Sequence, residues 1–521
     1  MAGRFAAALI ALVYLVVHPV VGGAGPCPQT SSSLAQAHFS RESLISAERY
    51  DGHQVWRLDW REVDQKIKAD ILLAIELLSI DIWRSSPAAL DIRLSPAQIH
   101  LLRPFLPLNF SIINFIPDLQ SLVDLSTPTL FSGVSTSNLT SLDTPFHDSY
   151  HSLEDIYAFG DGLVDEFPGM VEAIAVGESF EGSEIRGWRA HLAGNDSSSH
   201  VHRGQRGKKS KKGQVEEEMG GTDPLEFVVQ SGQHAREWIG PSTALYFLHA
   251  LVVDATNEPS GEIARLLRSF TFTVFPTINP DGYAYSHKHN RMWRKNRQQL
   301  GSELCSGLSY CFNWLGPVES DGSNFRAGID LNSNWGYKWR PGRSTSTCSD
   351  SYSGQMAFEA YETRVMANYL ANGTSWCPGC GRAQVDGDEG KGPRRRVRAF
   401  VDLHSYGQLF MFPFAHSCDD FPPDAEMLME AGLGVAKAMR RQQGEGYQAG
   451  QACDLTYRAP GDAIDFSYGV TDVQWSYSAE LRDTGTYGFL LPPKLIRPAA
   501  DELTAGLLYL ARFIYNVEVA V

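Results

Sequence analysis

The fold is decided by residues 227–242, which read FVVQSGQHAREWIGPS. Residues 227–230 form an apolar run typical of a buried strand, and Pro241 and Ser242 suit the first turn of a helix. His234 and Glu237 lie in the turn between them. Such turns, at the carboxyl ends of strands, are where α/β sheets present ligands. This segment therefore predicts an α/β domain with polar side chains at one sheet edge.

Strand-like and helical runs alternate on both sides of this turn. The helical runs begin at residues 153–167 and end with a C-terminal helix that places Leu503, Leu507, Leu510 and Ile514 on one side. The other clear strand-like runs are residues 270–275, 400–403 and 475–478. Alternation of this kind predicts a mixed central sheet with helices on both faces.

A second, smaller unit precedes this domain. Residues 51–125 combine the strand-like Val55–Leu58 with a helical stripe of Ile71, Leu72, Ile75 and Leu78, which predicts a compact α+β domain. Residues 126–148 follow as a linker, because the chain from 125 to 142 is rich in Ser, Thr and Pro and reads as exposed. Such a segment is a natural site of proteolysis. The larger domain then occupies residues 149–521.

The chain begins with the pattern of a secretory signal peptide. Arg4 precedes an apolar run from Phe5 to Val17, and small residues follow at 21–25. We therefore assign residues 1–24 to a signal and 25–50 to an N-terminal segment. The rival interpretation is an uncleaved anchor, but the run is shorter than the ~20 apolar residues that span a bilayer. No later segment is long and apolar enough to span.

Composition narrows the class of partner. The chain has 521 residues, 43% of them hydrophobic, and a formal charge of -15. A nucleic-acid groove needs a basic face to displace counterions, so this charge argues against DNA or RNA as partners.

Entry into the secretory pathway would make the eight cysteines candidates for disulfides. Cys377 and Cys380 are close enough to pair or to bind a metal, whereas Cys27 could remain unpaired. The same route would make glycan acceptors of Asn109, Asn138, Asn195 and Asn372.

Two polar stretches interrupt the larger domain, near residues 195–223 and 385–398. The first contains four lysines between 208 and 212, and the second contains Arg394, Arg395 and Arg396. They are solvated surface insertions or, alternatively, sites for a dibasic protease.

A second motif, Asp402-Leu403-His404-Ser405-Tyr406, also follows a strand-like run. Alone, a His-x-x-Glu spacing is weak, because it recurs by chance on many surfaces. With His404, however, the chain offers two imidazoles and one carboxylate, a ligand set that leaves a catalytic zinc with an open position for water.

Together with several further sequence blocks, these two motifs resemble the zinc metallocarboxypeptidases of the pancreatic carboxypeptidase A/B family, in their proenzyme form. The resemblance covers most of the chain and implies a carboxypeptidase-like α/β fold behind an activation pro-domain. The blocks that carry it are Val55–Leu58, Ile80–Trp83, Tyr150–Tyr157, Arg291–Lys295, His404–Leu409 and Glu480–Pro492.

This resemblance implies a role for each matching residue. One zinc ion would be held by His234, Glu237 and His404, with Asp330 orienting His234. Glu480 would be the general base; taken alone, it would be interpreted as a strand carboxylate paired with Arg482. Arg294 would stabilise the oxyanion. Substrate contacts would come from Arg236, Asn332, Ser333, Tyr406, Tyr457 and Ile464.

Ser333 is a departure from the family pattern. Active members carry an arginine at this position, which forms a two-pronged salt bridge to the terminal carboxylate of the substrate. Serine offers one neutral donor instead. Removing one partner of a desolvated ion pair costs ~3 to 5 kcal/mol, which corresponds to a factor on the order of 10² to 10³ or more in specificity. We therefore expect weak or absent peptidase activity.

Specificity and disulfide pairing are less constrained by the resemblance. Ile464 stands where the family places the base of its side-chain pocket and favours an apolar terminal residue, whereas Asp462 and Asp402 would favour a basic one. The resemblance pairs Cys418 with Cys453. It pairs Cys348 with Cys311 or Cys305.

Three hypotheses follow. The first is a secreted zinc-binding protein of the fungal branch described as inactive and linked to cell-wall and extracellular-matrix organisation. Its location would be extracellular, in the cell wall, or vacuolar. The second is a working exopeptidase that removes C-terminal residues after an activating protease cuts the chain, holding the carboxylate through Asn332, Arg291 or an insertion-loop arginine. The third is a structural module without metal.

Overall fold

The computed structural model describes residues 47–127, 138–193, 225–300, 328–341, 347, 349–371 and 397–519. The signal, the first insertion, residues 385–396 of the second insertion, and the cysteines at 27, 305, 311, 348, 377 and 380 lie outside these residues, as do Asn195 and Asn372; residues 397 and 398 already belong to a strand. Asn109 and Asn138 are described and exposed.

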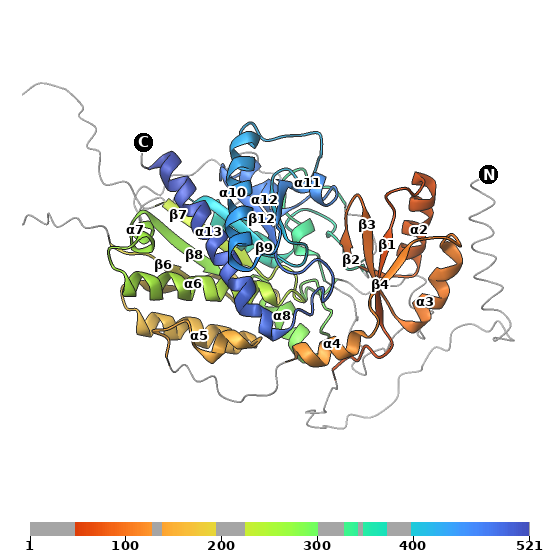
Figure 1. The fold of residues 1–521 in the computed structure, drawn as a ribbon, viewed down its shortest axis with the longest axis horizontal. Coiled ribbons are helices and arrows are strands. Elements are labelled where there is room, and N and C mark those ends of the chain that lie inside the picture. Colours follow the sequence, from red (N-terminus) through yellow and green to blue (C-terminus); the bar gives the residue numbers. More distant parts are fainter. Residues whose placement is uncertain are drawn as a thin grey trace, which may run out of the picture. The chain divides into compact units, whose positions relative to one another are not determined.

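The larger domain is built on an eight-stranded mixed sheet with the strand order β11-β10-β12-β9-β7-β8-β6-β5 (Figure 1). Its four central strands, β12, β9, β7 and β8, are parallel, and antiparallel neighbours join them on both sides. The strands are β5 (Val171–Glu178), β6 (Glu184–Ala190), β7 (Leu225–Ser231), β8 (Phe270–Phe275), β9 (Val397–His404), β10 (Leu409–Phe412), β11 (Gln448–Gln451) and β12 (Trp475–Glu480). The mixed sheet confirms the prediction.

Helices cover both faces of this sheet, because side chains alternate along each central strand. Phe227 and Val229 point to one core and Val228 to the other. The first core is covered by α5 (Leu153–Glu166), α6 (Ile239–Asn257), α10 (Ala425–Gln443) and α13 (Ile496–Glu518). The second is covered by α9 (Tyr361–Leu370), α11 (Ala452–Leu455) and α12 (Ala463–Gly469). The remaining helices are α7 (Glu262–Ser269) and α8 (Pro280–Lys288).

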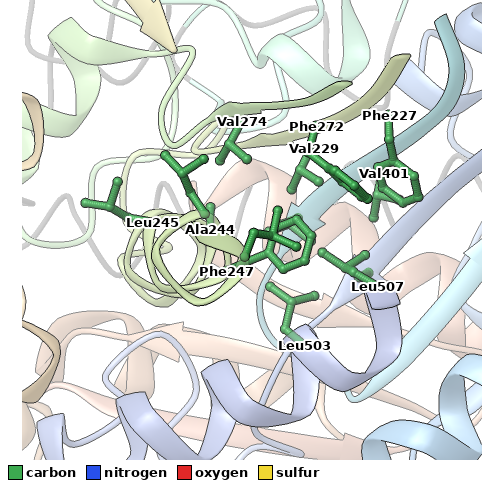
Figure 2. Packing of buried hydrophobic residues seen from close by; sticks show 14 of the residues in the cluster. Phe227, Val229, Ala244, Leu245, Phe247, Phe272, Val274, Val401, Leu503 and Leu507 are labelled. Carbon is green, nitrogen blue, oxygen red and sulfur yellow. The ribbon is translucent and has the colours of Figure 1, made fainter. Parts of the chain in front are cut away.

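Figure 2 shows how the first core is packed. Phe247 of α6 and Leu503 of α13 lie between the two helices and the strands, facing Val229 and Val401. Nearly every side chain of α6 is buried, so this helix lies inside the domain. The sheet edge that carries the site therefore rests on rigid, close-packed elements.

The amino-terminal domain is a four-stranded antiparallel sheet with the order β2-β3-β1-β4. Its elements are β1 (Gln54–Asp59), α2 (Gln65–Leu77), β2 (Asp81–Ser85), β3 (Ala89–Leu94), α3 (Pro96–Leu102), β4 (Ile112–Ile116) and α4 (Leu119–Ser126). Asp64 caps α2, and Ser95 and Gln98 form a capping box on α3. The α+β prediction holds, except that Leu72 is exposed while Ala74 completes the buried face of α2.

The segment after the amino-terminal domain differs from the exposed linker that its composition suggested. Leu139 is buried, and Leu142 packs against the core. His249 bonds to the Leu139 carbonyl at 2.6 Å, and Arg497 donates to the Leu142 carbonyl at 2.8 Å. These contacts satisfy backbone groups that would otherwise need water, so residues from 138 onward belong to the larger domain.

Candidate metal centre

The site lies at the carboxyl ends of three neighbouring strands. After β7, Gly232 takes a φ of +68°, and a Cβ there would meet Thr277 at 2.7 Å. The turn that follows carries His234 and Glu237 and leads into α6. His404 is the last residue of β9, and the sheet register pairs it with Glu480 at the end of β12. Residues far apart in sequence thus converge because the parallel strands end at one edge.

Three side chains aim their ligand atoms at one point. His234 Nδ1 lies 2.9 Å from Glu237 Oε1, and His404 Nδ1 lies 3.1 Å from His234 Nδ1 and 3.2 Å from Glu237 Oε2. Ligand atoms of a tetrahedral zinc site stand roughly 3.3 Å apart. All three residues are buried. Two imidazole nitrogens and a carboxylate at these separations suit a divalent metal ion.

The other ring nitrogen of each histidine faces a carboxylate. His234 Nε2 lies 3.1 Å from Asp330 Oδ1, and His404 Nε2 lies 2.8 Å from Asp402 Oδ2. Carboxylates in this position fix the ring orientation and direct Nδ1 toward the metal. We call His234, Glu237, His404 and Asp330 the metal end of the site.

Electrostatics at the metal end keep its carboxyl groups ionised. Burial would raise the pKa of Glu237, but the neighbouring His234 and His404 outweigh burial and hold this pKa well below its usual range. Burial likewise opposes the ionised form of Asp330, and its pKa is lowered chiefly by Arg294, which donates to Asp330 Oδ2 at 3.0 Å. Anionic ligands are what a divalent cation requires.

A pocket opens beside the metal end. From the larger domain it is lined by Arg294, Tyr406, Tyr457, Glu480 and a set of small or aliphatic side chains. Trp83, Arg84 and Ser85 of the amino-terminal domain also line it. Burial raises the pKa of Glu480 to about 8, and its Oε2 has no hydrogen-bond partner among the described residues.

Asn332, Ser333 and Asp462 also line the pocket, and we call these three residues the anchor end. Ser333 Oγ donates to Asp330 Oδ2 at 3.1 Å, and Asn332 Nδ2 donates to Asp462 Oδ2 at 3.0 Å. The amide oxygen of Asn332 accepts from Gln233 Nε2 and from the Ala463 amide, each at 3.0 Å. The described polar side chains of the anchor end are therefore directed at other protein groups.

The sequence matches the model of one protein family, described as zinc carboxypeptidase, over residues 156–506. The chain belongs to the zinc carboxypeptidase family. A Talaromyces marneffei protein named inactive metallocarboxypeptidase ecm14 is 31% identical over 497 residues, covering 89% of this chain and 73% of that protein. A Saccharomyces cerevisiae protein of the same name is 32% identical over 380 residues, covering 72% of this chain and 73% of that protein.

Solved structures agree on the fold of this chain. The carboxypeptidase A of Helicoverpa armigera superposes with a TM-score of 0.67 at 23% identity, covering 90% of this chain and 99% of that one. Thrombin activatable fibrinolysis inhibitor gives a TM-score of 0.67 at 22% identity, covering 89% and 99%. At this identity the likeness shows the fold alone.

Most of the site residues expected from sequence line the pocket, but Ile464, Arg236 and Asp330 do not; Asp330 lies behind His234. Ile464 packs into the hydrophobic core beneath α12, and the pocket wall is instead formed by Asp462, the residue that caps this helix. Arg236 is fully buried and directs Nη1 to Asp81 Oδ2 at 2.9 Å. The alternative interpretation of Glu480, a strand carboxylate paired with Arg482, does not hold, because Arg482 donates to Glu502 Oε2 at 2.8 Å.

Sequence reasoning missed the contact between Asp402 and His404. The sequence analysis placed Asp402 only in the pocket, although its spacing of two residues from His404 on a strand indicated the contact. Residues two apart on a strand share a face, so an aspartate at this spacing lies beside the ligand histidine.

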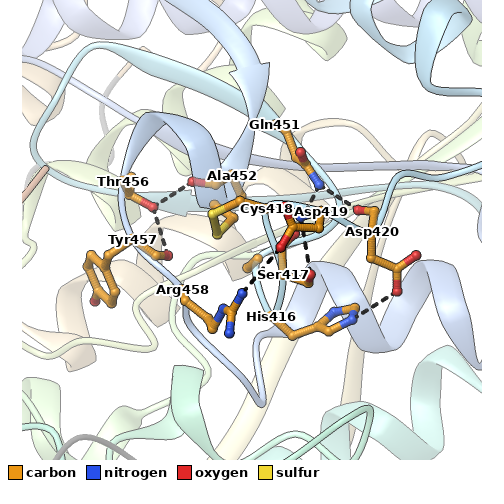
Figure 3. The surroundings of a disulfide bond; sticks show 12 residues. His416, Ser417, Cys418, Asp419, Asp420, Gln451, Ala452, Thr456, Tyr457 and Arg458 are labelled. Carbon is orange, nitrogen blue, oxygen red and sulfur yellow. Dashed lines mark hydrogen bonds and ion pairs between the residues drawn. A yellow bond between two sulfur atoms is a disulfide. The ribbon is translucent and has the colours of Figure 1, made fainter. Parts of the chain in front are cut away.

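One disulfide falls within the described residues and confirms the pairing of Cys418 with Cys453 (Figure 3). It joins the loop after β10 to the first turn of α11. Gln451 reinforces the junction by donating to the Ser417 and Asp420 carbonyls at 3.1 and 2.7 Å. The bridge therefore stiffens the segment that carries Thr456 and Tyr457 to the pocket wall. The expected partners Cys348, Cys311 and Cys305 lie outside the described residues.

Proposed function

We propose that this chain is a secreted, zinc-binding metallocarboxypeptidase-like protein whose peptidase activity is absent or strongly impaired, and that it acts in cell-wall organisation. The family match and the relatives named inactive metallocarboxypeptidase support the first part. The cell-wall role rests on the resemblance of the sequence to the fungal branch, and the secreted location rests on the N-terminal signal pattern.

The anchor end carries the proposal of impaired activity. An exopeptidase must hold the terminal carboxylate of its substrate, and here the two nearest donors, Ser333 and Asn332, already donate to carboxylates. The arginine that the larger domain contributes to the pocket lining, Arg294, is itself paired with Asp330. A substrate carboxylate would face Asp462 in place of a guanidinium. The loss of such an ion pair costs ~3 to 5 kcal/mol, or a factor on the order of 10² to 10³ or more.

The metal end supports zinc binding. His234 and His404 would each supply Nδ1 and Glu237 its carboxylate, while Asp330 and Asp402 hold the rings in place. Zinc supplies Lewis acidity to a carbonyl or a water when it is bound. Around it, Arg294 stands within 3.9 Å of Glu237 as a cation for a developing oxyanion, and Glu480 stands as a buried proton acceptor.

The amino-terminal domain is proposed to act as a pro-domain that an activating protease removes. Its Asp81 binds the buried Arg236 through both carboxylate oxygens, at 3.0 and 2.9 Å. Its Asp91 accepts from the Tyr406 hydroxyl at 3.0 Å and pairs with Arg57. Because Trp83 and its neighbours line the pocket, peptide C-termini or wall material would reach the site only after this domain leaves.

A second candidate function is an active exopeptidase in which Glu480 serves as general base. One observation favours it: Glu480 is retained beside the metal end, pairs in register with His404, and has a free carboxylate oxygen among the described residues. Such a base requires a pKa near the working pH, and burial raises that of Glu480 to about 8.

The deciding experiment measures zinc and turnover in the same preparation. The full chain is loaded with zinc, treated by limited proteolysis to cut between the domains, and assayed with peptides that differ only in their C-terminal residue. We expect one zinc per chain and no efficient release of any residue. Efficient release that a Glu480→Gln variant abolishes would overturn the inactive assignment and establish the second candidate. Absence of zinc would reject both.

A further inference from the structure

A pair of buried histidines connects the start of the larger domain to its interior, and the proposed function does not use it. His147 lies in the short turn Pro145–Asp148, and His249 lies in α6; both side chains are buried. His147 Nε2 lies 2.9 Å from His249 Nδ1, and His249 Nε2 lies 2.6 Å from the carbonyl oxygen of Leu139. The pair therefore ties two points of residues 138–150, which we call the entry segment, to the buried helix α6.

These hydrogen bonds fix where the protons lie. A carbonyl oxygen only accepts, so His249 Nε2 carries a hydrogen, and Nδ1 of the neutral ring is an acceptor. His147 Nε2 donates to that acceptor. One added proton can be shared if the hydrogen of His147 moves to its other ring nitrogen. Two added protons leave N–H groups facing each other across 2.9 Å with no acceptor between them.

The surroundings supply no anion that would compensate a protonated ring. Asp148 pairs with Arg497, and Asp501 accepts from the Tyr246 hydroxyl at 2.7 Å, so both acids are already occupied. The charged and titratable groups near the pair come from three elements, and α5 adds only an aromatic ring. They are Asp143, Asp148 and His151 of the entry segment, Tyr246 of α6, Arg497 and Asp501 of α13, and the Phe159 ring of α5.

Protonation of either ring is therefore opposed while the segment is closed. Burial is the main cause that lowers the pKa of His147, to about 2, and His249 and Arg497 add to this shift. Burial also lowers the pKa of His249, and its bond to Leu139 offsets only part of that effect. A solvated histidine has a pKa of about 6.5, so the open segment binds more protons than the closed one.

Contacts that do not depend on these protons hold the entry segment in place at neutral pH. Arg497 donates to two backbone carbonyls of the segment at 2.8 and 2.6 Å, and Phe146 stacks on Phe159 with ring centres 3.9 Å apart. His151 Nε2 lies 2.6 Å from the Phe146 carbonyl oxygen, and a ring that gains a proton at Nδ1 keeps that bond. The histidine pair is therefore the part of the segment whose bonds fail in acid.

We propose that His147 and His249 form an acid-operated latch, which releases the entry segment from α6 when both rings take up a proton while the central sheet keeps its fold. The chain passes through this segment from the amino-terminal domain into the larger one, so its release exposes that stretch of backbone to proteolysis. The latch goes beyond the proposed function, because it works in the same way whether or not the chain is a peptidase.

The pH range of the latch follows from the two states. Above pH 6.5 the rings are neutral in both, so the segment stays closed, and below pH 6.5 uptake of protons favours the open state. The equilibrium constant for opening grows about 10-fold per pH unit for each ring that titrates. Between pH 7.5 and 5.0 it should rise about 30-fold if one ring titrates and about 10³-fold if both do.

The test is amide hydrogen exchange of the full chain at pH 7.5 and 5.0, read by mass spectrometry of its peptides. Protection factors are compared, because intrinsic exchange rates themselves change with pH, and peptides from β7 and β9 serve as internal references. We expect the protection of residues 138–150 to fall by about 10³ on acidification, with a much smaller change in the two strands. A fall of about 30-fold or less, or an equal fall in the strands, would overturn the proposal.

The matched variants are the double substitution His147→Gln with His249→Gln and the single substitution His151→Gln. Glutamine donates and accepts without titrating, so the double variant should hold the segment equally protected at both pH values, to within about 3-fold. His151→Gln makes the same change on a neighbouring histidine and should retain most of the fall. An undiminished fall in the double variant, or its loss in His151→Gln, would contradict the latch.

His147→Gln alone covers the case in which the double variant is already open at neutral pH. It leaves one titrating ring in the pair, so the fall should shrink to about 30-fold. A fall that stays near 10³ in this variant would overturn the proposal. Zinc content and turnover do not enter these measurements, so the latch and the proposed function stand or fall separately.

Discussion

The metal end and the anchor end share one pocket, and Asp330 touches both: its Oδ1 faces His234, and its Oδ2 accepts from Ser333. At the metal end, each carboxylate lies beside an imidazole or a guanidinium. At the anchor end, Asp462 accepts from the Asn332 amide, and Ser333 offers a neutral hydroxyl that donates to Asp330. The residues suited to a metal and the residues beside them that would meet a substrate therefore differ in how their charges are balanced, and intact metal ligands alone do not imply peptidase activity.

The largest effect should come from the ligands themselves. His404→Ala removes one of three donors and leaves Glu237 and His234 with an incomplete shell, so bound zinc should fall from one per chain to nearly none. Metal analysis after dialysis measures this directly. Asp462→Asn, at the anchor end, should keep its zinc. Stoichiometric zinc in His404→Ala would show that the metal binds elsewhere.

The next largest effect should come from rebuilding the anchor end. Ser333→Arg alone should restore little activity, because the introduced guanidinium would pair with Asp462. Combined with Asp462→Gly, the substitution should raise kcat/KM by a factor on the order of 10² to 10³ for peptides with a free carboxylate. This recovery requires Glu480 to act as the general base.

Ser333→Ala serves as the control for the rebuilt anchor, because it changes the hydroxyl without adding charge. Adding Glu480→Gln to the double variant should abolish the recovered activity. A double variant that stays inactive while it binds peptide would place the main defect outside the anchor end.

The disulfide offers a stability test that should separate the two ends. Replacing both Cys418 and Cys453 with serine opens a loop with a sequence separation of 35 residues. The chain-entropy model predicts a loss of about 3 to 4 kcal/mol in the free energy of unfolding. Denaturant unfolding measures the loss, and zinc affinity should stay nearly constant because the metal ligands lie on other elements. A parallel fall in zinc affinity would show that the pocket loops support the metal end.

The smallest effect should come from the carboxylates behind the histidines. Asp330→Asn and Asp402→Asn should each weaken zinc binding by about 10- to 100-fold, because the remaining ring nitrogen loses an anionic partner. Competition with a chelator of known affinity measures both. Asp330→Asn should also release Arg294 and Ser333, whereas Asp402→Asn should not. Identical effects on peptide binding would argue that Asp330 does not link the two ends.

Much of the fold and the metal ligands could be predicted from the sequence, because apolar periodicity and ligand spacing are local signals. The strands around Val228 and Phe400 and the turn that bears His234 were predicted in this way. The bond between Asn332 and Asp462 could not be predicted, since it joins residues 130 apart through side-chain orientation. For the same reason the partner of Arg482 could not be predicted: strand alternation says which face a residue takes, but not that the distant Glu502 meets this arginine.

The sheet register that pairs His404 of β9 with Glu480 of β12 limits how far sequence changes could move these two residues apart. Neighbouring strands stand about 4.8 Å apart, so the spacing between a metal ligand and the acidic group opposite it is a property of the backbone ladder. Drift in the surrounding loops can silence or redirect such a site without disturbing that spacing. If the proposed loss of activity is right, the ladder would still hold His404 and Glu480 opposite one another, and catalysis could be regained by changes in a few loop residues rather than by a new fold.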